Sequence, residues 1–241
     1  MNWLDKKILL SPNIETLLNN HKTNSIKVTF VNPFSYNLVE QRSEYKDVFD
    51  GVYVDGASLV KIFNLMHGAN ISRYSFDFSS IASDVLEFAV ENSKKVAFIG
   101  GKQEEISLAV ENIKLQYSGI DIVFYRNGYF NTDQELVECL KSLEELKVDL
   151  IIVGMGTPYQ EDFISKIDSH LEQNFIAFTC GGFLSQTAVK GDYYHRWVKK
   201  LGLRWLQRAV SNQHVRKRLV SDYPRFFVKY VLRVAKSKFI L

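Results

Sequence analysis

One carboxylate beside a glycine is the clearest candidate in this chain for acid–base chemistry. Asp55 directly follows the apolar run 51–54 and precedes Gly56. A carboxylate at the end of a strand can act as a general base that removes a proton from an attacking hydroxyl group. Asp also commonly caps helices, and the following stretch 57–68 has a helical pattern. From the residues alone, both roles for Asp55 stay open.

Three further segments place polar residues, in two of them together with glycine, at or directly after the ends of apolar runs. They are VNPF with Asn32, GGKQEE with Gly101 and Lys102, and GMGTPYQE with Gly154, Gly156, Gln160 and Glu161. Helices that begin after such runs present free N–H groups to anions, so converging loops of this kind would suit a nucleotide diphosphate. None of them matches the GxxxxGK[ST] or GxGxxG patterns. The GMGTPYQE segment also reads as a tight corner between a strand and a helix.

An alternation of strands and helices must position these residues. Short runs that are apolar on both faces occur at 26–31, 51–55, 95–100, 120–125, 148–153 and 174–179. Strands covered on both sides have this composition. Amphipathic helical stretches such as 79–95 and 133–147 separate them. The pattern predicts an α/β fold with a largely parallel sheet and crossover helices, in which the candidate loops share the carboxyl edge of the sheet.

The charge of the chain is divided unevenly. Residues 194–241 hold 13 Lys or Arg and one acidic residue, so this segment carries +12 and the remaining residues carry −9. We place a boundary near Gly191, with an α/β body over 1–191 and a basic helical appendage over 192–241. Interleaved Trp and Phe favour an anionic membrane surface over nucleic acid as the partner. The same aromatic residues could also pack onto the body.

The remaining composition indicates which cellular compartment and which cofactors to expect. Cys139 and Cys180 read as buried thiols of a reducing compartment. No signal peptide and no apolar run of about 20 residues is visible, so we expect a cytoplasmic protein. The five histidines lack metal-ligand spacing and no Asp-x-Asp pair occurs, so we assign no metal site.

Several motifs in order resemble one enzyme family over about residues 26–225. They are VDGASLV (54–60), SRYSFD (72–77), GGKQEE (100–105), NGYF (127–130), DLIIVGMGTPYQE (149–161) and LRWLQR (203–208) followed by Arg216. They resemble the WecG/TagA/CpsF glycosyltransferases. The resemblance implies a Rossmann-like fold of the GT-E type and an inverting, metal-independent enzyme. Such enzymes move a hexose or N-acetylhexosamine from a UDP-sugar to a polyprenyl-diphosphate-linked GlcNAc-type acceptor in O-antigen, capsule or wall-polymer synthesis.

The resemblance also implies roles for individual residues. Asp55 would be the general base, Asn32 and Arg73 would line the site, and Gln160 would contact substrate. The terminal helices would reach the inner face of the cell membrane and contribute arginines to the site. A departing UDP needs its charge stabilised, and the candidates from the appendage are Arg208, Arg216 and Arg218. Each of these arginines could instead contact lipid headgroups alone.

Two points stay open from the sequence. Phe30 stands two residues before Asn32, where the family usually has Thr, and Arg204 replaces a usual Glu before Trp205. These departures leave the transferred sugar undetermined. The alternative to an enzyme is a non-catalytic nucleotide- or nucleic-acid-binding module that uses the basic tail. We expect a UDP-sugar, a lipid-linked acceptor and the membrane as partners, no nucleic acid, and a homo-oligomer as a possible assembly.

Overall fold

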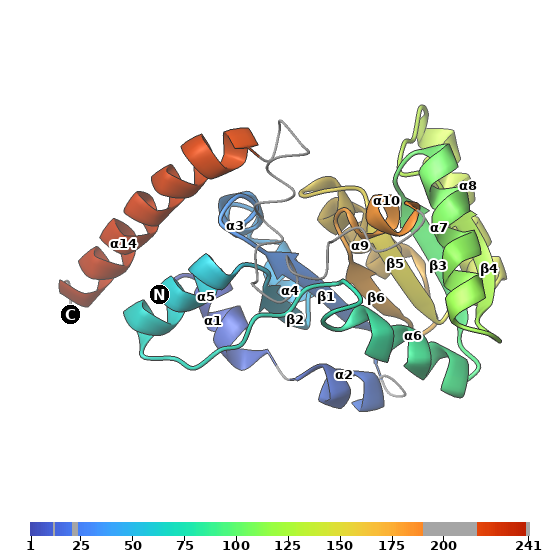
Figure 1. Ribbon diagram of the computed structural model, residues 1–241, viewed down its shortest axis with the longest axis horizontal. Coiled ribbons are helices and arrows are strands. Elements are labelled where there is room, and N and C mark those ends of the chain that lie inside the picture. Colours follow the sequence, from blue (N-terminus) through green and yellow to red (C-terminus); the bar gives the residue numbers. More distant parts are fainter. Residues whose placement is uncertain (12, 21–23, 190–215, 240–241) are drawn as a thin grey trace.

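A six-stranded parallel sheet with helices on both faces forms the body of the protein. The computed structural model describes residues 1–11, 13–20, 24–189 and 216–239 (Figure 1). The strand order is β2-β1-β6-β5-β3-β4, and every neighbouring pair is parallel. The strands are β1 (Ile26–Val31), β2 (Gly51–Val54), β3 (Lys95–Gly100), β4 (Asp121–Arg126), β5 (Leu150–Gly154) and β6 (Ile176–Thr179). All six predicted strands and the α/β class are confirmed.

The helices form two layers because alternate side chains of the strands point to opposite faces of the sheet. In β5, Ile151 and Val153 enter one buried cluster and Leu150 and Ile152 enter the other. The first face is covered by α1 (Trp3–Leu10), α3 (Tyr36–Glu40), α4 (Tyr45–Val48), α5 (Ala57–His67), α8 (Asp133–Glu145), α9 (Tyr159–His170) and α14 (Tyr223–Phe239). The second is covered by α2 (Ile14–Asn20), α6 (Ala82–Glu91), α7 (Gln103–Gln116) and α10 (Phe183–Thr187).

The last described helix packs on the body. A π-helical turn η1 (Arg218–Asp222) leads into α14. Phe226, Tyr230 and Val234 recur every four residues on one side of α14, and each is at most 3% exposed within the first cluster. This side of α14 is therefore buried against the α/β body. The predicted boundary near Gly191 falls outside the described residues and stays a prediction.

A buried polar cluster ties α14 to three other helices of the body. The Asp5 carboxylate in α1 is 1% exposed and accepts hydrogen bonds from the hydroxyls of Tyr36 in α3 and Tyr230 in α14. The Tyr230 hydroxyl lies 2.9 Å from His67 Nε2 in α5. Arg233 donates to the Tyr36 hydroxyl at 2.9 Å and lies 3.7 Å from Asp5 Oδ2. The chain thus closes its C-terminal helix onto its first one.

Two further expectations can be compared with the described residues. Cys139 and Cys180 are both buried and free. Burial raises the pKa of the Cys139 thiol to about 11 and that of Cys180 further. Neither thiol is a nucleophile at neutral pH as a result. Over the part of the chain that the structure describes, we find no helix with the length and hydropathy needed to cross a bilayer.

Candidate active site

The predicted loops converge at the carboxyl edge of the sheet. The neighbouring strands β3 and β5 are followed by α7 and α9, which cover opposite faces. Helices that diverge in this way open a crevice between the two strand ends, and ligands of doubly wound folds bind there. The segments GGKQEE and GMGTPYQE begin at these two ends. Their placement therefore fits the site expected for a nucleotide.

A second group of polar residues gathers at the ends of β1 and β2. Val31 pairs with Val54 in the sheet, and the Asp55 N–H donates to the Val31 carbonyl at 2.8 Å. Asn32 and Asp55 therefore follow directly on paired residues. Arg73 donates to Asp55 Oδ1 at 2.8 Å and lies 3.6 Å from Asp77. Two carboxylates thus fix the guanidinium group of Arg73.

Asp55 does not cap the helix that follows it. The N-cap of α5 is Gly56, and no side-chain hydrogen bond is made at that position. The Asp55 side chain instead bonds to Arg73, and about a third of it is exposed. A carboxylate that is partly exposed at a strand end can meet a substrate hydroxyl. This placement favours the catalytic alternative for Asp55 over the capping one.

Asn32 shapes the first loop. Its Oδ1 accepts hydrogen bonds from the N–H groups of Phe34 and Ser35 at 2.9 and 3.1 Å. Its own N–H donates to Ser35 Oγ, and its carbonyl accepts the N–H of Tyr36 at the start of α3. The Nδ2 group makes no hydrogen bond with the described residues, so its two N–H groups can donate to a ligand.

The glycines at the ends of β3 and β5 allow close backbone approach. Gly100 pairs with Gly154, and a Cβ at Gly100 would overlap the Gly154 carbonyl group. A Cβ at Gly154 would lie 2.9 Å from both Cys180 Sγ and the Gly181 carbonyl. Gly101 continues the contact, because its N–H donates to Gly154 and its carbonyl accepts the N–H of Gly128. The backbones at the ends of β3 and β5 therefore pack directly against each other.

Two predicted site residues, Gly156 and Lys102, lie in the loops that follow these strand ends. Gly156 has a φ of +76°, and no described atom lies within 4 Å of where its Cβ would stand. Lys102 is exposed at the start of α7, and its ammonium group pairs with no described carboxylate. Both can contact a ligand bound at these strand ends.

The side chains of Gln160 and Glu161, in contrast, are buried beneath the turn that follows β5. Gln160 is 4% exposed and Glu161 is fully buried. The Gln160 side chain donates to Thr157 Oγ1 and Glu161 Oε1, and its Oε1 accepts the N–H of Gly181 at 3.2 Å. Every polar atom of the Gln160 amide therefore has an internal partner, and the residue joins the turn after β5 to the turn after β6.

The arginines expected from the appendage are only partly placed. Arg208 lies outside the described residues, as does the side chain of Arg218. Arg216 is exposed at the beginning of the last described segment. The structure therefore brings together Asp55, Arg73 and Asn32 on one side of the edge and the glycine loops on the other, and it leaves the arginine predictions open.

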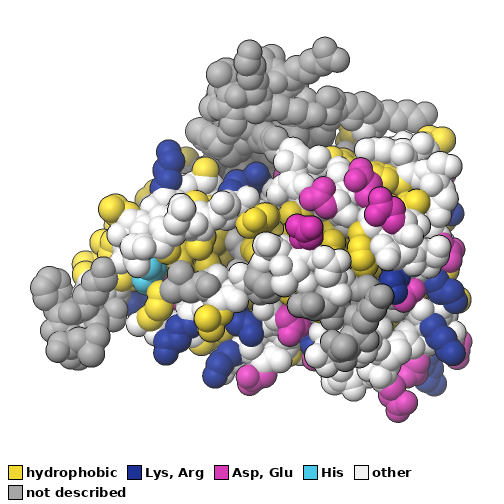
Figure 2. Space-filling view, turned by 90° about the horizontal axis from the view of Figure 1, so that it is seen from below, with side chains coloured by type: hydrophobic (Ala, Val, Ile, Leu, Met, Phe, Trp, Pro, Cys, Tyr) yellow, Lys and Arg dark blue, Asp and Glu magenta, His cyan; other side chains and the backbone are white. Residues whose placement is uncertain are grey.

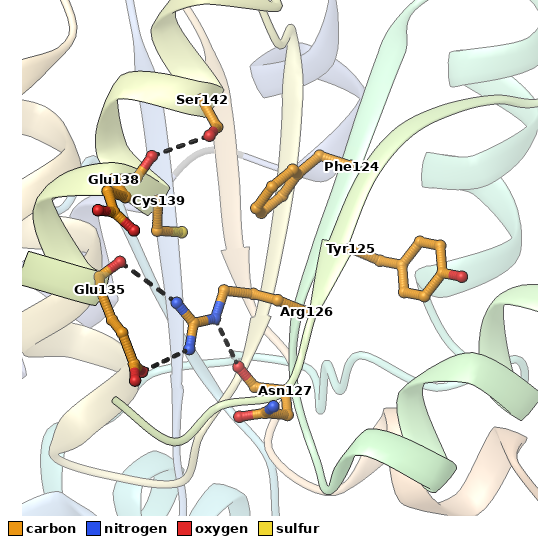
Figure 3. Close-up of a pocket in the computed structure, with 8 residues that line it drawn as sticks. All are labelled: Phe124, Tyr125, Arg126, Asn127, Glu135, Glu138, Cys139 and Ser142. Atoms are coloured by element: carbon orange, nitrogen blue, oxygen red, sulfur yellow. Dashed lines mark hydrogen bonds and ion pairs between the residues drawn. The ribbon is translucent and has the colours of Figure 1, made fainter. Parts of the chain in front are cut away.

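A shallow hollow of about 350 Å³ lies at the opposite end of the sheet from Asp55. Figure 3 shows Arg126 of β4 crossing it toward Glu135 of α8. Arg126 also donates to the carbonyls of Asn127 and Tyr129, and its guanidinium stacks 3.8 Å above the ring of Phe130. Its hydrogen bonds thus hold the NGYF turn in place beside the GGKQEE loop, and we assign the hollow no ligand.

Sequence reasoning missed the turn after β6 and the buried hydroxyls that support the loops. Gly181 and Gly182 follow β6 as the other glycine pairs follow their strands, so the same pattern could have identified them. Thr29 and Thr179 interrupt otherwise apolar strands, which is the signal for a buried polar network. In the described ranges, no three His, Cys, Asp or Glu side chains are grouped closely enough to hold a metal ion.

Comparisons with known proteins point to one enzyme family. A model of the "Glycosyl transferase WecG/TagA/CpsF family" matches residues 9–239. The chain is 42% identical over 228 residues to a UDP-Gal:alpha-D-GlcNAc-diphosphoundecaprenol beta-1,4-galactosyltransferase of Shigella boydii, covering 95% of this chain and 94% of that protein. It is 26% identical to an N-acetylglucosaminyldiphosphoundecaprenol N-acetyl-beta-D-mannosaminyltransferase of Staphylococcus aureus, over 94% and 86% of the two chains.

A more distant likeness to a solved structure adds no inference. It is a selenomethionine-substituted domain of unknown function 1792, which aligns with a TM-score of 0.40 at 12% identity. The alignment covers 83% of this chain and 85% of that one.

Proposed function

The chain belongs to the WecG/TagA/CpsF family of glycosyltransferases, and from this premise we propose that it transfers galactose from UDP-galactose to a GlcNAc-diphosphate polyprenyl lipid. The donor sugar is taken from the 42% identical galactosyltransferase, since the mannosaminyltransferase is only 26% identical. Both relatives are named for a GlcNAc-diphosphoundecaprenol acceptor, which supports that part of the proposal.

The layout of the strand ends supports one orientation of the donor. From β3 to β1 the sheet crosses β5 and β6, and three strand spacings amount to about 14 Å. An extended nucleoside diphosphate sugar can bridge such a distance. We place the nucleotide near Gly101 and Lys102, the diphosphate along Gly154 and Gly156, and the sugar beside Asn32.

The observation that carries the mechanism is the partly exposed carboxylate of Asp55 at the end of β2. In our proposal it accepts the proton of the acceptor hydroxyl while that oxygen attacks the anomeric carbon and the bond to UDP breaks. Arg73 orients Asp55 through the 2.8 Å ion pair. Attack from the face opposite UDP inverts the anomeric centre, so an α-linked donor gives a β-linked product.

The departing UDP gains negative charge, and positive groups must stabilise it. Lys102, exposed at the start of α7, is one candidate. We propose that Arg208, Arg216 and Arg218 add to it from the C-terminal segment. The sequence contains no Asp-x-Asp pair, which supports a reaction that needs no metal ion.

The lipid-linked acceptor calls for contact with a membrane, and the free side of α14 suits it. Val228 and Leu232 are 60% and 56% exposed and alternate with exposed Lys229 and Lys236. A shallow hollow of about 370 Å³ is lined by Lys229, Leu232, Arg233 and Lys236. Figure 2, seen from below, shows hydrophobic and basic side chains mixed at the end of the molecule where α5 lies. We propose that this side of α14 rests on anionic headgroups at the inner face of the cell membrane.

A donor screen tests the proposed function. UDP-galactose, UDP-glucose, UDP-GlcNAc and UDP-ManNAc are each incubated with a GlcNAc-diphosphate-lipid analogue in excess EDTA, and the release of UDP is measured. We expect turnover with UDP-galactose above the other donors and undiminished by EDTA. Turnover that prefers another donor would reject galactose. Loss in EDTA that Mg²⁺ or Mn²⁺ restores would reject the metal-free mechanism.

A further inference from the structure

A buried hydrogen-bond network lies directly beneath the loops of the site. The Glu161 side chain, at the start of α9, is fully buried. Its Oε1 accepts hydrogen bonds from Thr29 Oγ1 at 2.8 Å, Thr157 Oγ1 at 3.1 Å and Gln160 Nε2 at 3.1 Å. Thr29 belongs to β1, and Thr157 belongs to the turn after β5. A single oxygen atom therefore connects β1 to the turn after β5, although β1 and β5 are not neighbours in the sheet.

The network continues into β6, the strand between those two. Thr179 Oγ1 donates to Thr29 Oγ1 at 3.1 Å. The Gly181 N–H donates to Gln160 Oε1 at 3.2 Å. Because Glu161 Oε1 accepts from the amide nitrogen of Gln160, the amide oxygen must face Gly181. Glu161 thereby sets the orientation of the Gln160 amide.

We propose that Glu161 is a positioning residue of the donor site: its buried carboxyl group orients Gln160 and so fixes the spacing of the turns at Gly156 and Gly181. This inference rests on the proposed donor site, in which these turns border the diphosphate. Glu161 touches no ligand in this account. It acts through Gln160, Thr157 and Thr29, and Thr29 lies in β1 three residues before Asn32.

The burial of this carboxyl group is hard to explain by stability alone. Its Oε2 is buried with no hydrogen-bond partner among the described residues. A buried polar atom without a partner costs free energy, and the neighbouring core of the sheet is built from apolar residues. A network that spans three strand ends does, however, hold the loops at fixed separations, which a site for a diphosphate requires.

Two substitutions of Glu161 distinguish the role of its hydrogen-bond acceptor oxygen from the role of its negative charge. Glu161→Gln keeps an oxygen that can accept from Thr29, Thr157 and Gln160, so we expect the Kd of UDP and the KM of the UDP-sugar to stay within about threefold of the wild-type values. Glu161→Met removes the acceptor at similar size. It leaves three donors unpaired, so we expect both constants to rise about tenfold or more, with a smaller change in kcat.

A second position and a surface control complete the test. Thr29→Val removes one donor and keeps the branched shape, so it should raise the same constants in the same direction if Glu161→Met does not fold. Lys166→Met, on an exposed position of α9, should leave them unchanged. Kd is measured by titration calorimetry with UDP, and thermal melting confirms that each variant is folded.

The outcomes distinguish this inference from the proposed function. Folded Glu161→Met or Thr29→Val with wild-type Kd and KM would overturn the positioning role. A loss in Glu161→Gln as large as in Glu161→Met would also overturn it, because the charge and not the hydrogen-bond acceptor would then matter. If the wild-type protein neither binds UDP nor transfers a sugar, the proposed function itself fails.

Discussion

Asp55 and Asp77 share Arg73 as a partner but differ in their own surroundings. Burial raises the pKa of the Asp77 carboxyl group. Hydrogen bonds from Ser79 and Ser75 and the charge of Arg73 outweigh this effect, so the pKa of Asp77 lies below its ordinary value. Asp77 thus stabilises its own turn, whereas Asp55 stands at a strand end and accepts a hydrogen bond from Arg73. The two carboxylates should respond differently to the same substitution.

We predict that Asp55→Asn lowers kcat by about 10²- to 10⁴-fold, the usual contribution of a positioned general base. Because Asp55 does not cap α5, the melting temperature and the Kd of UDP should change little. The matched control Asp77→Asn should instead lower the free energy of unfolding by about 1–2 kcal/mol and affect turnover less. Near-normal turnover in Asp55→Asn would remove Asp55 from the mechanism.

Glu161 makes the stability of the protein depend on pH. Desolvation raises the pKa of its carboxyl group, although hydrogen bonds from Gln160, Thr29 and Thr157 act in the opposite direction. A folded-state pKa above the unfolded value means that the neutral form favours folding. This contribution is full below the ordinary glutamate pKa of 4.5 and is lost as the pH rises through the folded-state value.

We therefore predict that the stability of the wild-type protein relative to Glu161→Gln falls as the pH is raised above 4.5. Urea unfolding of both proteins at a series of pH values measures the difference. The neighbouring residues Tyr45 and Asp162 are the same in both proteins, so the comparison isolates the carboxyl group of Glu161. A difference that does not change with pH, or that grows, would show that the pKa of Glu161 is not raised.

At the scale of elements, the sheet could be predicted and the docking of its last helix could not. The β-branched runs between amphipathic helices identify strands because each covered strand carries its own local pattern. The contact of Asp5 with Tyr230 joins residues 225 positions apart, and no local pattern reports it. For the same reason Gln160 and Glu161 read as polar residues at a helix start, while their burial depends on Thr29 and Gly181.

The attachment of α14 can be loosened at one hydroxyl group. We predict that Tyr230→Phe lowers the free energy of unfolding by about 1–2 kcal/mol, because Asp5 loses a buried donor and the hydrogen bond between the Tyr230 hydroxyl and His67 is lost. Hydrogen exchange in α14 should speed up more than in β5. Leu232→Ala, on the exposed side of the same helix, is the control. Equal exchange in all three proteins would mean that the Asp5 cluster does not hold α14.

At the scale of the whole molecule, the two sides of α14 have different roles. One side of the helix completes the core, and the other side carries exposed bases and aliphatic residues. This division was only half visible in the sequence, where the aromatic residues of the tail suited both a membrane and the core. The structure assigns Phe226 and Tyr230 to the core.

Binding to anionic vesicles should therefore depend on the exposed bases of α14. We predict that replacing Lys229 and Lys236 by Glu weakens sedimentation with phosphatidylglycerol vesicles at low salt, since each basic residue near such a surface contributes about 1 kcal/mol. Transfer to a short-chain acceptor in solution should persist. Unchanged vesicle binding would place the membrane contact elsewhere, and loss of transfer to the short-chain acceptor would implicate these lysines in catalysis.

The stereochemistry of the product tests the central claim most directly. The purified protein is incubated with UDP-galactose and a GlcNAc-diphosphate-lipid analogue, and the anomeric coupling of the new linkage is measured by NMR. A single-displacement reaction with Asp55 as general base predicts a β-linked disaccharide from the α-linked donor, and much slower formation of the same product by Asp55→Asn. An α-linked product, or no product with any UDP-sugar, would contradict the account.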